Sequence, residues 1–213
     1  MQSNNRPKII GVTGNIGSGK TIFCKNLPEF IQVYFADDIA HDVLQLPDVI
    51  DKLVTRWGRE VLSDGKPDRQ RIGSIVFQDY EELAFLNSVI HPHVLIRMQA
   101  LVMRTTRKFI CFEVPLLFET NLQECFDYII LIQTNKENAI KRIMQRNNIL
   151  EIEAGNRIDQ QIEDTNKEKQ ADLVIRNDSD IQVLYQAAEE FAKRADKIAY
   201  KYIKPFTMAI TGY

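Results

Sequence analysis

Short hydrophobic runs alternate with longer helical or polar stretches along the 213 residues of the chain. Such alternation indicates parallel strands that are joined by crossover connections and covered by helices on both faces of the sheet. The pattern therefore predicts an α/β fold of three layers around a five-stranded parallel sheet. The runs expected to form the strands are Lys8–Thr13, Val33–Ala36, Phe109–Val114, Tyr128–Ile132 and Leu173–Ile175.

The gap between the second and third runs is about seventy residues, which is too long for a single crossover helix. Pro47–Trp57 and Glu81–Arg104 carry hydrophobic residues at helical spacing, and residues 63–67 between them are typical of a turn. We therefore predict a helical insertion over residues 40–105. It would lie above the carboxyl ends of the strands, where open α/β sheets bind their ligands.

A second polar, helix-prone stretch runs from Lys136 to Gln170. It is either the solvated face of surface helices or, over residues 141–168, a mobile lid whose arginines close on phosphate groups. Residues 1–204 are expected to form one domain that includes the insertion and the lid. The tail, residues 205–213, leaves three alternatives open: packing on the body, contact with a partner, or partial disorder. The basic residues of the polar stretch are Lys141, Arg142, Arg146, Arg157, Lys167 and Lys169.

The composition argues against nucleic-acid-binding, membrane-spanning and secreted proteins. The 27 basic and 29 acidic residues give a net charge of −2, which argues against a nucleic-acid partner held by bulk charge. No hydrophobic run approaches the roughly 18 residues of a membrane span, and the first residues lack the hydrophobic core of a signal peptide. Cys24, Cys111 and Cys125 are expected to be reduced thiols, the first two buried in core elements. We therefore expect a cytoplasmic protein without a membrane or nucleic-acid partner.

Residues 14–21 read GNIGSGKT, which fits the phosphate-binding loop pattern Gly-x-x-x-x-Gly-Lys-Ser/Thr. A hydrophobic run precedes this loop, and a helix-forming stretch that Pro28 ends follows it. Backbone N–H groups of such a loop surround a phosphate, and its glycines let the chain curl tightly. A glycine-rich turn with a surface lysine, the alternative, would not require this order of strand, loop and helix. The chain is therefore predicted to bind a nucleoside triphosphate in a P-loop NTPase fold.

The residues of the loop have distinct expected roles. Lys20 would reach the outer phosphates of ATP, and the hydroxyl of Thr21 would hold a Mg²⁺ ion. The loop residues expected to bind the nucleotide are Gly14, Asn15, Ile16, Gly17, Ser18, Gly19, Lys20 and Thr21.

Further features separate the classes of P-loop protein. A GTPase needs Asp-x-x-Gly, which the sequence lacks, and its Asn-Lys-x-Asp is Asn135-Lys-Glu-Asn138 here, with an amide in place of the acid. A small-molecule kinase instead needs a carboxylate near the γ-phosphate to orient the acceptor hydroxyl or take its proton. Asp37 and Asp38 at the end of the second run, and Glu113 at the end of the third, are placed for this role. Asp38 is expected to cap or begin a helix over Ile39–Leu46, which leaves Asp37 as the preferred candidate.

The loop is followed, in order, by FADDIAH from Phe35, LNSVIHP from Leu86 and VPLLFE from Val114. In this order the segments resemble the dephospho-coenzyme A kinases, and the resemblance extends from about Lys8 to Leu184. It implies transfer of the ATP γ-phosphoryl group to the 3′-hydroxyl of dephospho-coenzyme A with Mg²⁺, the last step of coenzyme A synthesis. The alternatives are another small-metabolite or nucleotide kinase of the same fold, or a nucleotide-binding regulator without turnover.

The resemblance also implies which residues act on the reacting groups. Asp37 matches the second Asp of the family pattern Asp-Ala-Asp and would be the base, whereas Phe35 replaces the first Asp. Lys20 and Arg142 complete the expected catalytic set, with Arg142 on the γ-phosphate.

Other residues are expected to hold the nucleotide and the acceptor. Arg146, Arg157 and Asn177 would lie beside the nucleotide, although Asn177-Asp-Ser replaces the family's Asn-x-Gly. Pro115 and Leu116 are expected to shape the turn after the third strand rather than to carry chemistry. The substrate-binding set is Asp37, Arg69, His91, Pro115 and Leu116.

Overall fold

The computed structural model describes residues 6–77, 79–159 and 164–212. These residues form two compact units. The first, called the sheet unit, contains the described residues up to Phe35 and those from Val102 to Lys204. The second, called the helical unit, contains Ala36–Leu101 and the segment that begins at Pro205.

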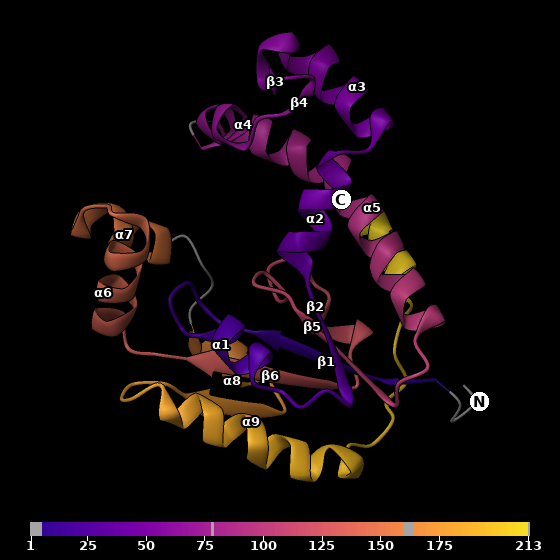
Figure 1. Cartoon of the computed structure of the whole chain (residues 1–213), viewed down its shortest axis with the longest axis vertical. Helices are drawn as coiled ribbons and strands as arrows, with labels where there is room; N and C mark the ends of the chain where they lie inside the picture. The colour runs from indigo at the N-terminus through magenta and orange to yellow at the C-terminus, as the bar shows by residue number, and fades with distance from the viewer. Residues whose placement is uncertain (1–5, 78, 160–163, 213) are drawn as a thin grey trace. The chain divides into compact units, whose positions relative to one another are not determined.

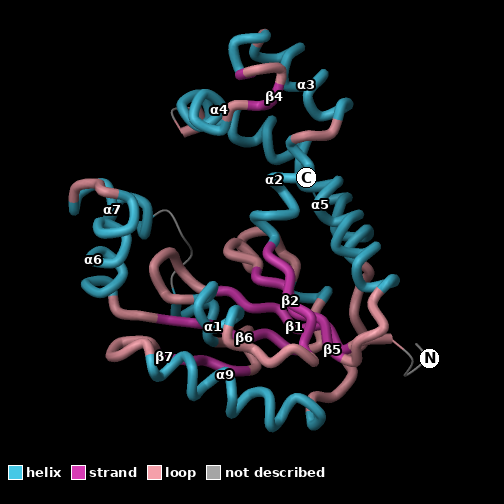
Figure 2. Tube along the Cα trace, in the orientation of Figure 1, coloured by secondary structure: helices cyan, strands magenta, loops and turns pink. Residues whose placement is uncertain are grey.

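The sheet unit is built on five parallel strands, which appear as arrows in Figure 1 and in magenta in Figure 2. Every neighbouring pair is parallel, and each of the five predicted runs forms a strand. The prediction of a five-stranded parallel sheet is therefore confirmed. In spatial order the strands are β2 (Ile31–Phe35), β5 (Phe109–Glu113), β1 (Lys8–Thr13), β6 (Tyr128–Gln133) and β7 (Leu173–Arg176).

The described residues of the sheet unit form five helices and two short 3₁₀ helices. They are α1 (Lys20–Lys25), α6 (Lys136–Asn147), α7 (Glu151–Asp159), α8 (Asp164–Glu168) and α9 (Gln182–Arg194), with η2 (Gln123–Cys125) and η3 (Ala195–Lys197). The stretch predicted to be helix-prone thus contains α6, α7 and α8, while residues 160–163 of the predicted lid lie outside the described residues.

The core of the sheet unit explains why its strands read as unbroken hydrophobic runs. Every residue of β1 and of β5 is buried, as expected of central strands that are covered on both faces. Phe23 of α1 and Phe191 of α9 pack with Ile10 on one face, along which α9 runs in Figure 1. On the other face, the side chains of Leu117 and Phe126 pack so closely on Gly11 that a Cβ atom there would lie 2.7 Å from Leu117.

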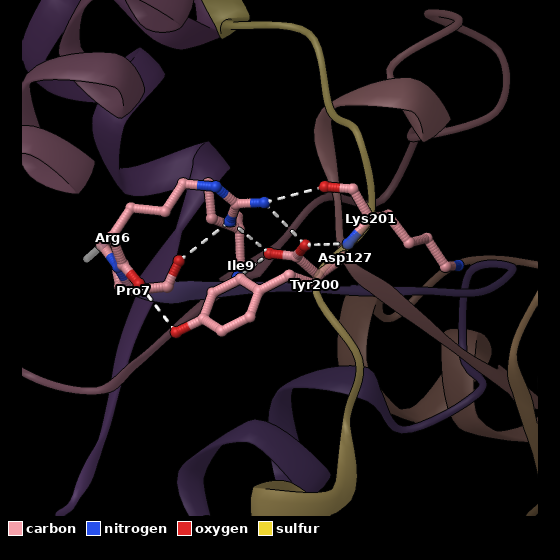
Figure 3. A network of polar contacts seen from close by, with 6 residues as sticks. All are labelled: Arg6, Pro7, Ile9, Asp127, Tyr200 and Lys201. Carbon is pink, nitrogen blue, oxygen red and sulfur yellow. Dashed lines mark hydrogen bonds and ion pairs between the residues drawn. The ribbon is translucent and has the colours of Figure 1, made fainter. Parts of the chain in front are cut away.

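Arg6 and Lys201 are hydrogen-bonded to Asp127 at the amino ends of β1 and β6, as Figure 3 shows. Asp127 is fully buried, and its carboxylate accepts hydrogen bonds from both terminal nitrogens of Arg6 at 2.5 and 2.8 Å. It also accepts from the backbone N–H groups of Ile9 at 2.9 Å and Lys201 at 2.8 Å. The hydroxyl of Tyr200 donates to the carbonyl of Arg6 at 3.0 Å. We call Arg6, Ile9, Asp127, Tyr200 and Lys201 the amino-end network.

The helical unit contains four α-helices, two 3₁₀ helices and one hairpin among its described residues. They are α2 (Ala36–Leu44), α3 (Pro47–Trp57), η1 (Arg59–Val61), β3 (Leu62–Ser63), β4 (Lys66–Pro67), α4 (Arg69–Val76), α5 (Tyr80–Arg104) and η4 (Phe206–Gly212), with the last residues of α5 counted in the sheet unit. The turn predicted over residues 63–67 is this hairpin. Asp64 and Gly65 close it with φ angles of 50° and 75°, as primed hairpin turns require.

The boundary between β2 and α2 differs from the prediction. Helix α2 begins at Ala36, directly after the strand, and not at Ile39. Asp37 and Asp38 therefore both lie in the first turn of the helix, where negative side chains interact favourably with the helix dipole. Strand β2 begins at Ile31, two residues before the predicted start at Val33.

The last segment of the chain packs back on the body, which was one of three predicted alternatives. Ile198 and Ile203 are buried in the sheet unit, and Phe206 is buried in the helical unit. The N–H of Phe206 donates to Gln99 Oε1 at 2.9 Å. All three cysteines are buried thiols, as predicted for the two in core elements. Among the described residues, no helix has the length and hydrophobicity that crossing a membrane would require.

Candidate active site

The loop between β1 and α1 has a backbone that its glycines make possible. Gly14 and Gly19 have φ angles of 148° and 101°, which residues with a side chain rarely adopt. A Cβ atom on Gly14 would lie 2.0 Å from the carbonyl oxygen of Ile132. A Cβ on Gly19 would lie 2.7 Å from the amide nitrogen of Asn177. The loop is therefore closely packed against the carboxyl ends of β6 and β7.

Lys20 turns back over the loop that precedes it. Its ammonium group donates to the carbonyl of Gly14 at 2.7 Å and to that of Asn15 at 3.1 Å. The residue is only 8% exposed, so its charge is held close to the loop backbone. Two neutral carbonyls are weaker partners for an ammonium group than phosphate oxygens. The arrangement therefore keeps a positive charge available for exchange onto an anion.

Thr21 and Glu113 meet where β1 and β5 end. The Thr21 hydroxyl donates to Glu113 Oε1 at 2.9 Å, and Glu113 is 6% exposed. Glu113 pairs with Val12 of β1 and with Phe35 of β2, so three strands fix its position. A hydroxyl and a carboxylate are oxygen ligands of the kind that Mg²⁺ prefers. The two residues therefore fit a Mg²⁺ ion held mainly by phosphates and water.

Asn177 and Arg142 connect the loop to the segments that follow β6 and β7. The Asn177 side chain donates to the carbonyl of Ser18 at 2.8 Å. The guanidinium of Arg142 donates to the carbonyl of Gly17 at 3.2 Å and to the carbonyl of Asn177 at 3.1 Å. The hydroxyl of Thr134 donates to the same Asn177 carbonyl at 2.7 Å. Both predicted nucleotide-site residues thus contact the loop itself.

A cavity of about 400 Å³ opens beside these groups. Its lining combines loop glycines, the start of α1 and two arginines of α6: Gly17, Gly19, Lys20, Thr21, Ile22, Arg142, Arg146, Asn177 and Ile181. A second cavity of about 440 Å³ lies between β7 and α9, with Phe191 and Arg194 in its lining. The first cavity is the candidate site because the predicted loop residues line it.

Of the remaining predicted site residues in the sheet unit, some lie at the cavity and others do not. Arg146 is exposed at the cavity and donates to Asn147 Oδ1 at 2.9 Å. Arg157 is exposed on α7 and does not line this cavity. The Pro115 carbonyl accepts from the Thr13 hydroxyl at 3.3 Å, while Leu116 is exposed. Pro115 therefore shapes the turn after β5 next to the start of the loop.

Asp37, Arg69 and His91 lie in the helical unit, so they are described within it. Asp37 is exposed in the first turn of α2. Arg69 Nη1 lies 3.3 Å from Nδ1 of His41. Burial lowers the pKa of His91 below its usual value, which favours the neutral imidazole. The roles assigned to these three residues stay predictions.

Two contacts of the site were not anticipated. The hydrogen bond of Thr21 to Glu113 places a carboxylate beside the predicted metal ligand, and the position of Glu113 at a strand end is a sequence signal for it. The sequence places Lys167 in a basic, polar stretch, yet Lys167 is fully buried and its Nζ donates to Asn15 Oδ1 at 2.6 Å. Its polar sequence surroundings carry no sign of that burial.

Comparison with known proteins relates the sequence of this chain to one group of enzymes. A family model described as dephospho-CoA kinase matches residues 8–183. A dephospho-CoA kinase of Fusobacterium nucleatum is 36% identical over 187 residues, which cover 87% of this chain and 97% of the relative.

Solved structures agree with this similarity. A dephospho-CoA kinase from Campylobacter jejuni superposes with a TM-score of 0.64 at 28% identity, covering 89% of this chain and 97% of that one. A shikimate kinase from Acinetobacter baumannii shares the fold, with a TM-score of 0.55 at 13% identity over 92% of this chain and 97% of its own. The predicted three-layer P-loop kinase fold is thus confirmed.

Proposed function

Because the chain belongs to the dephospho-CoA kinase family, we propose that it transfers the γ-phosphoryl group of ATP to the 3′-hydroxyl of dephospho-coenzyme A. The proposal is supported chiefly by the cavity that Lys20, Thr21 and Arg142 line beside the loop, together with the hydrogen bond that joins Thr21 to Glu113. These groups supply what phosphoryl transfer needs: backbone donors, positive charge and a place for a metal ion.

Binding of ATP would begin with an exchange of partners at Lys20. The ammonium group leaves the carbonyls of Gly14 and Asn15 and takes up oxygens of the outer phosphates, which are its stronger acceptors. Arg146 is exposed at the cavity and adds positive charge there. Arg142 reaches the γ-phosphate when its guanidinium leaves the Gly17 carbonyl. These changes place positive charge where negative charge spreads in the transition state.

Thr21 and Glu113 would hold Mg²⁺ together with the phosphates of ATP. The hydroxyl of Thr21 is the expected ligand, and Glu113, 2.9 Å from it, orients that hydroxyl or binds a water of the ion. When bound, Mg²⁺ neutralises charge on the β- and γ-phosphates. The described residues contain no group of three or more His, Cys, Asp or Glu side chains that could hold a metal ion.

Asp37 is the residue that we propose as the base. Phe35 pairs with Glu113 in the sheet, and Asp37 follows Phe35 by two positions along the chain. In the reaction the 3′-oxygen forms a bond to the γ-phosphorus, the bond from that phosphorus to the β-phosphate oxygen breaks, and the proton of the hydroxyl passes to the Asp37 carboxylate. ADP leaves, and coenzyme A is the other product. Arg69 and His91 are proposed to bind the acceptor.

Phe35, which replaces an acid of the family pattern, is proposed to leave turnover intact. Its side chain packs on the hydrophobic core with Val33. The substitution therefore extends the core at the end of β2. We also propose that the protein works in the cytoplasm, in keeping with its three buried thiols and its net charge of −2. The same charge makes a nucleic-acid partner unexpected.

The test is ADP release from Mg²⁺-ATP with a panel of acceptors: dephospho-coenzyme A, AMP, adenosine, shikimate and gluconate. Turnover with dephospho-coenzyme A alone is expected. Turnover with a different acceptor would keep the kinase chemistry and overturn the substrate. No turnover with any acceptor, in protein that binds ATP, would instead favour the non-catalytic regulator. The variant Asp37→Asn separates these cases further. If the parent is an active kinase, this variant should lose turnover but still bind ATP.

A further inference from the structure

Lys167 is a charged side chain with no solvent exposure. Its Nζ donates to Asn15 Oδ1 at 2.6 Å and forms an ion pair with Glu119 Oε1 at 2.7 Å. Glu119 lies in the segment after β5, and its side chain is 18% exposed. Burial of an ammonium group costs free energy unless ion pairs and hydrogen bonds offset that cost. Lys167 therefore makes a specific internal contact, in contrast to the exposed Lys169 two positions later.

Asn15 is the residue on which Lys167 and Lys20 converge. Its side chain accepts the hydrogen bond from Lys167, and its backbone carbonyl accepts the one from Lys20 at 3.1 Å. The same carbonyl accepts from the N–H of Ser18 at 3.1 Å, which closes the turn of the loop. A shift of Asn15 would therefore move the turn and the resting contact of Lys20 together.

A bound nucleotide would affect the two contacts of Asn15 differently: it would break the contact with Lys20 and leave the contact with Lys167 intact. Binding of phosphates would draw Lys20 away from the Asn15 carbonyl. Lys167 instead donates to the Asn15 side chain, and the ion pair of Lys167 with Glu119 holds the ammonium group in place. Lys167 also lies in α8, at the carboxyl-terminal end of the predicted lid. The loop is thus attached to that end of the lid by a buried contact.

We propose that Lys167 is a positioning residue that holds Asn15, and through it the phosphate-binding loop, in place while Lys20 changes partners. The inference rests on the proposed function, because it takes the loop to be the ATP site. It assigns Lys167 no contact with the reacting atoms, so its removal acts on ATP affinity more than on the rate of the bound complex.

The test compares four variants by calorimetric titration with Mg²⁺-ATP. They are Asn15→Ala, Lys167→Met, the double variant, and Lys169→Met as a control that removes an exposed charge nearby. We expect Asn15→Ala and Lys167→Met each to weaken ATP binding roughly tenfold, as loss of a charge-assisted hydrogen bond allows. The double variant should be about as weak as a single one, because both remove the same contact. Lys169→Met should match the parent.

Two outcomes would overturn the proposal. One is parental ATP affinity in Asn15→Ala, and the other is a double variant whose loss equals the product of the single losses. If Lys167→Met does not fold, parental ATP affinity in Asn15→Ala would still overturn the proposal, since that variant leaves the Lys167–Glu119 pair in place. A merely structural role would lower the melting temperature of the variants without changing the Kd of folded protein.

Kinetics provide a second readout, which requires the proposed function. With dephospho-coenzyme A as acceptor, KM for ATP should rise about tenfold in Asn15→Ala while kcat changes less. A fall in kcat at unchanged KM would contradict the positioning role. If the parent binds Mg²⁺-ATP but does not phosphorylate dephospho-coenzyme A, the proposed function fails, while the ATP titrations still decide the role of Lys167.

Discussion

The two ends of the β-sheet use their charged residues in opposite ways. At the carboxyl ends of the strands, Lys20 and Arg142 donate hydrogen bonds to backbone carbonyls, beside a cavity of about 400 Å³. At the amino ends, the buried carboxylate of Asp127 accepts four hydrogen bonds, two of them from Arg6 (Figure 3). Neutral carbonyls release a cation more readily than a buried carboxylate does. The comparison indicates a carboxyl end built for exchange of partners and an amino end built for stability.

The largest effect is expected from Lys20→Met. Loss of the ammonium group removes positive charge from the phosphates in the transition state, so kcat/KM should fall by roughly 10² to 10³ or more. The melting temperature should change little, since the hydrogen bonds that the ammonium group donates to Gly14 and Asn15 are made to neutral carbonyls. Steady-state kinetics and thermal unfolding check both parts, with Lys25→Met at the end of α1 as the control. A variant with parental kcat/KM would remove Lys20 from the mechanism.

The next effect in size is expected from Asp127→Ala, and it should fall on stability. The variant leaves Arg6 and two backbone N–H groups without their carboxylate, which should cost about 3 kcal/mol of unfolding free energy. Below the unfolding temperature its kcat should stay near that of the parent. Urea unfolding measures the first quantity, and Glu189→Ala on exposed α9 surface is the control. Loss of activity in fully folded Asp127→Ala would break the separation between the two ends.

A smaller effect is expected from Thr21→Ala, because Glu113 and the phosphates remain to hold the ion. The variant should need more Mg²⁺ for half-maximal turnover, by roughly tenfold, since one oxygen ligand is lost. Thr21→Ser keeps the hydroxyl and should restore the parental requirement. Turnover measured as a function of Mg²⁺ concentration tests this. Equal Mg²⁺ requirements in all three proteins would show that the hydroxyl is not a ligand.

The smallest effect is expected from Lys201→Met. Its Nζ pairs with Asp172 at 2.7 Å, but the lysine side chain is 47% exposed, so solvent screens the pair. The cost in unfolding free energy should be about 0.5 kcal/mol. The backbone N–H that binds Asp127 is untouched by the substitution. A loss as large as that of Asp127→Ala would mean that the exposed pair, and not the buried carboxylate, stabilises the amino end.

The sequence predicted what depends on neighbouring residues and missed much of what depends on distant ones. The bounds of β1 and of α3 match their predictions because a hydrophobic run or a helical period marks them directly. The start of α2 was wrong by three positions, because nothing in the sequence separates the last strand residue from the first helical one there. Element boundaries of this kind depend on tertiary packing.

Long-range contacts of the site were the hardest to foresee. The loop motif indicated Lys20 and Thr21, since the chemistry lies within eight consecutive residues. The contact of Lys167 with Asn15 joins residues 152 positions apart, and that of Arg6 with Asp127 joins residues 121 apart. No local pattern encodes such pairs, and a buried lysine inside a polar stretch looks like any solvated charge.

Transfer of the γ-phosphoryl group of ATP to one hydroxyl of dephospho-coenzyme A is tested most directly on the product itself. Parent protein is incubated with Mg²⁺-ATP and dephospho-coenzyme A, and the product is analysed by mass spectrometry and ³¹P NMR. We expect one added phosphate, as a monoester on the 3′-oxygen, with one ADP formed for each product molecule. Unchanged dephospho-coenzyme A, or phosphate attached at a different oxygen, would contradict it.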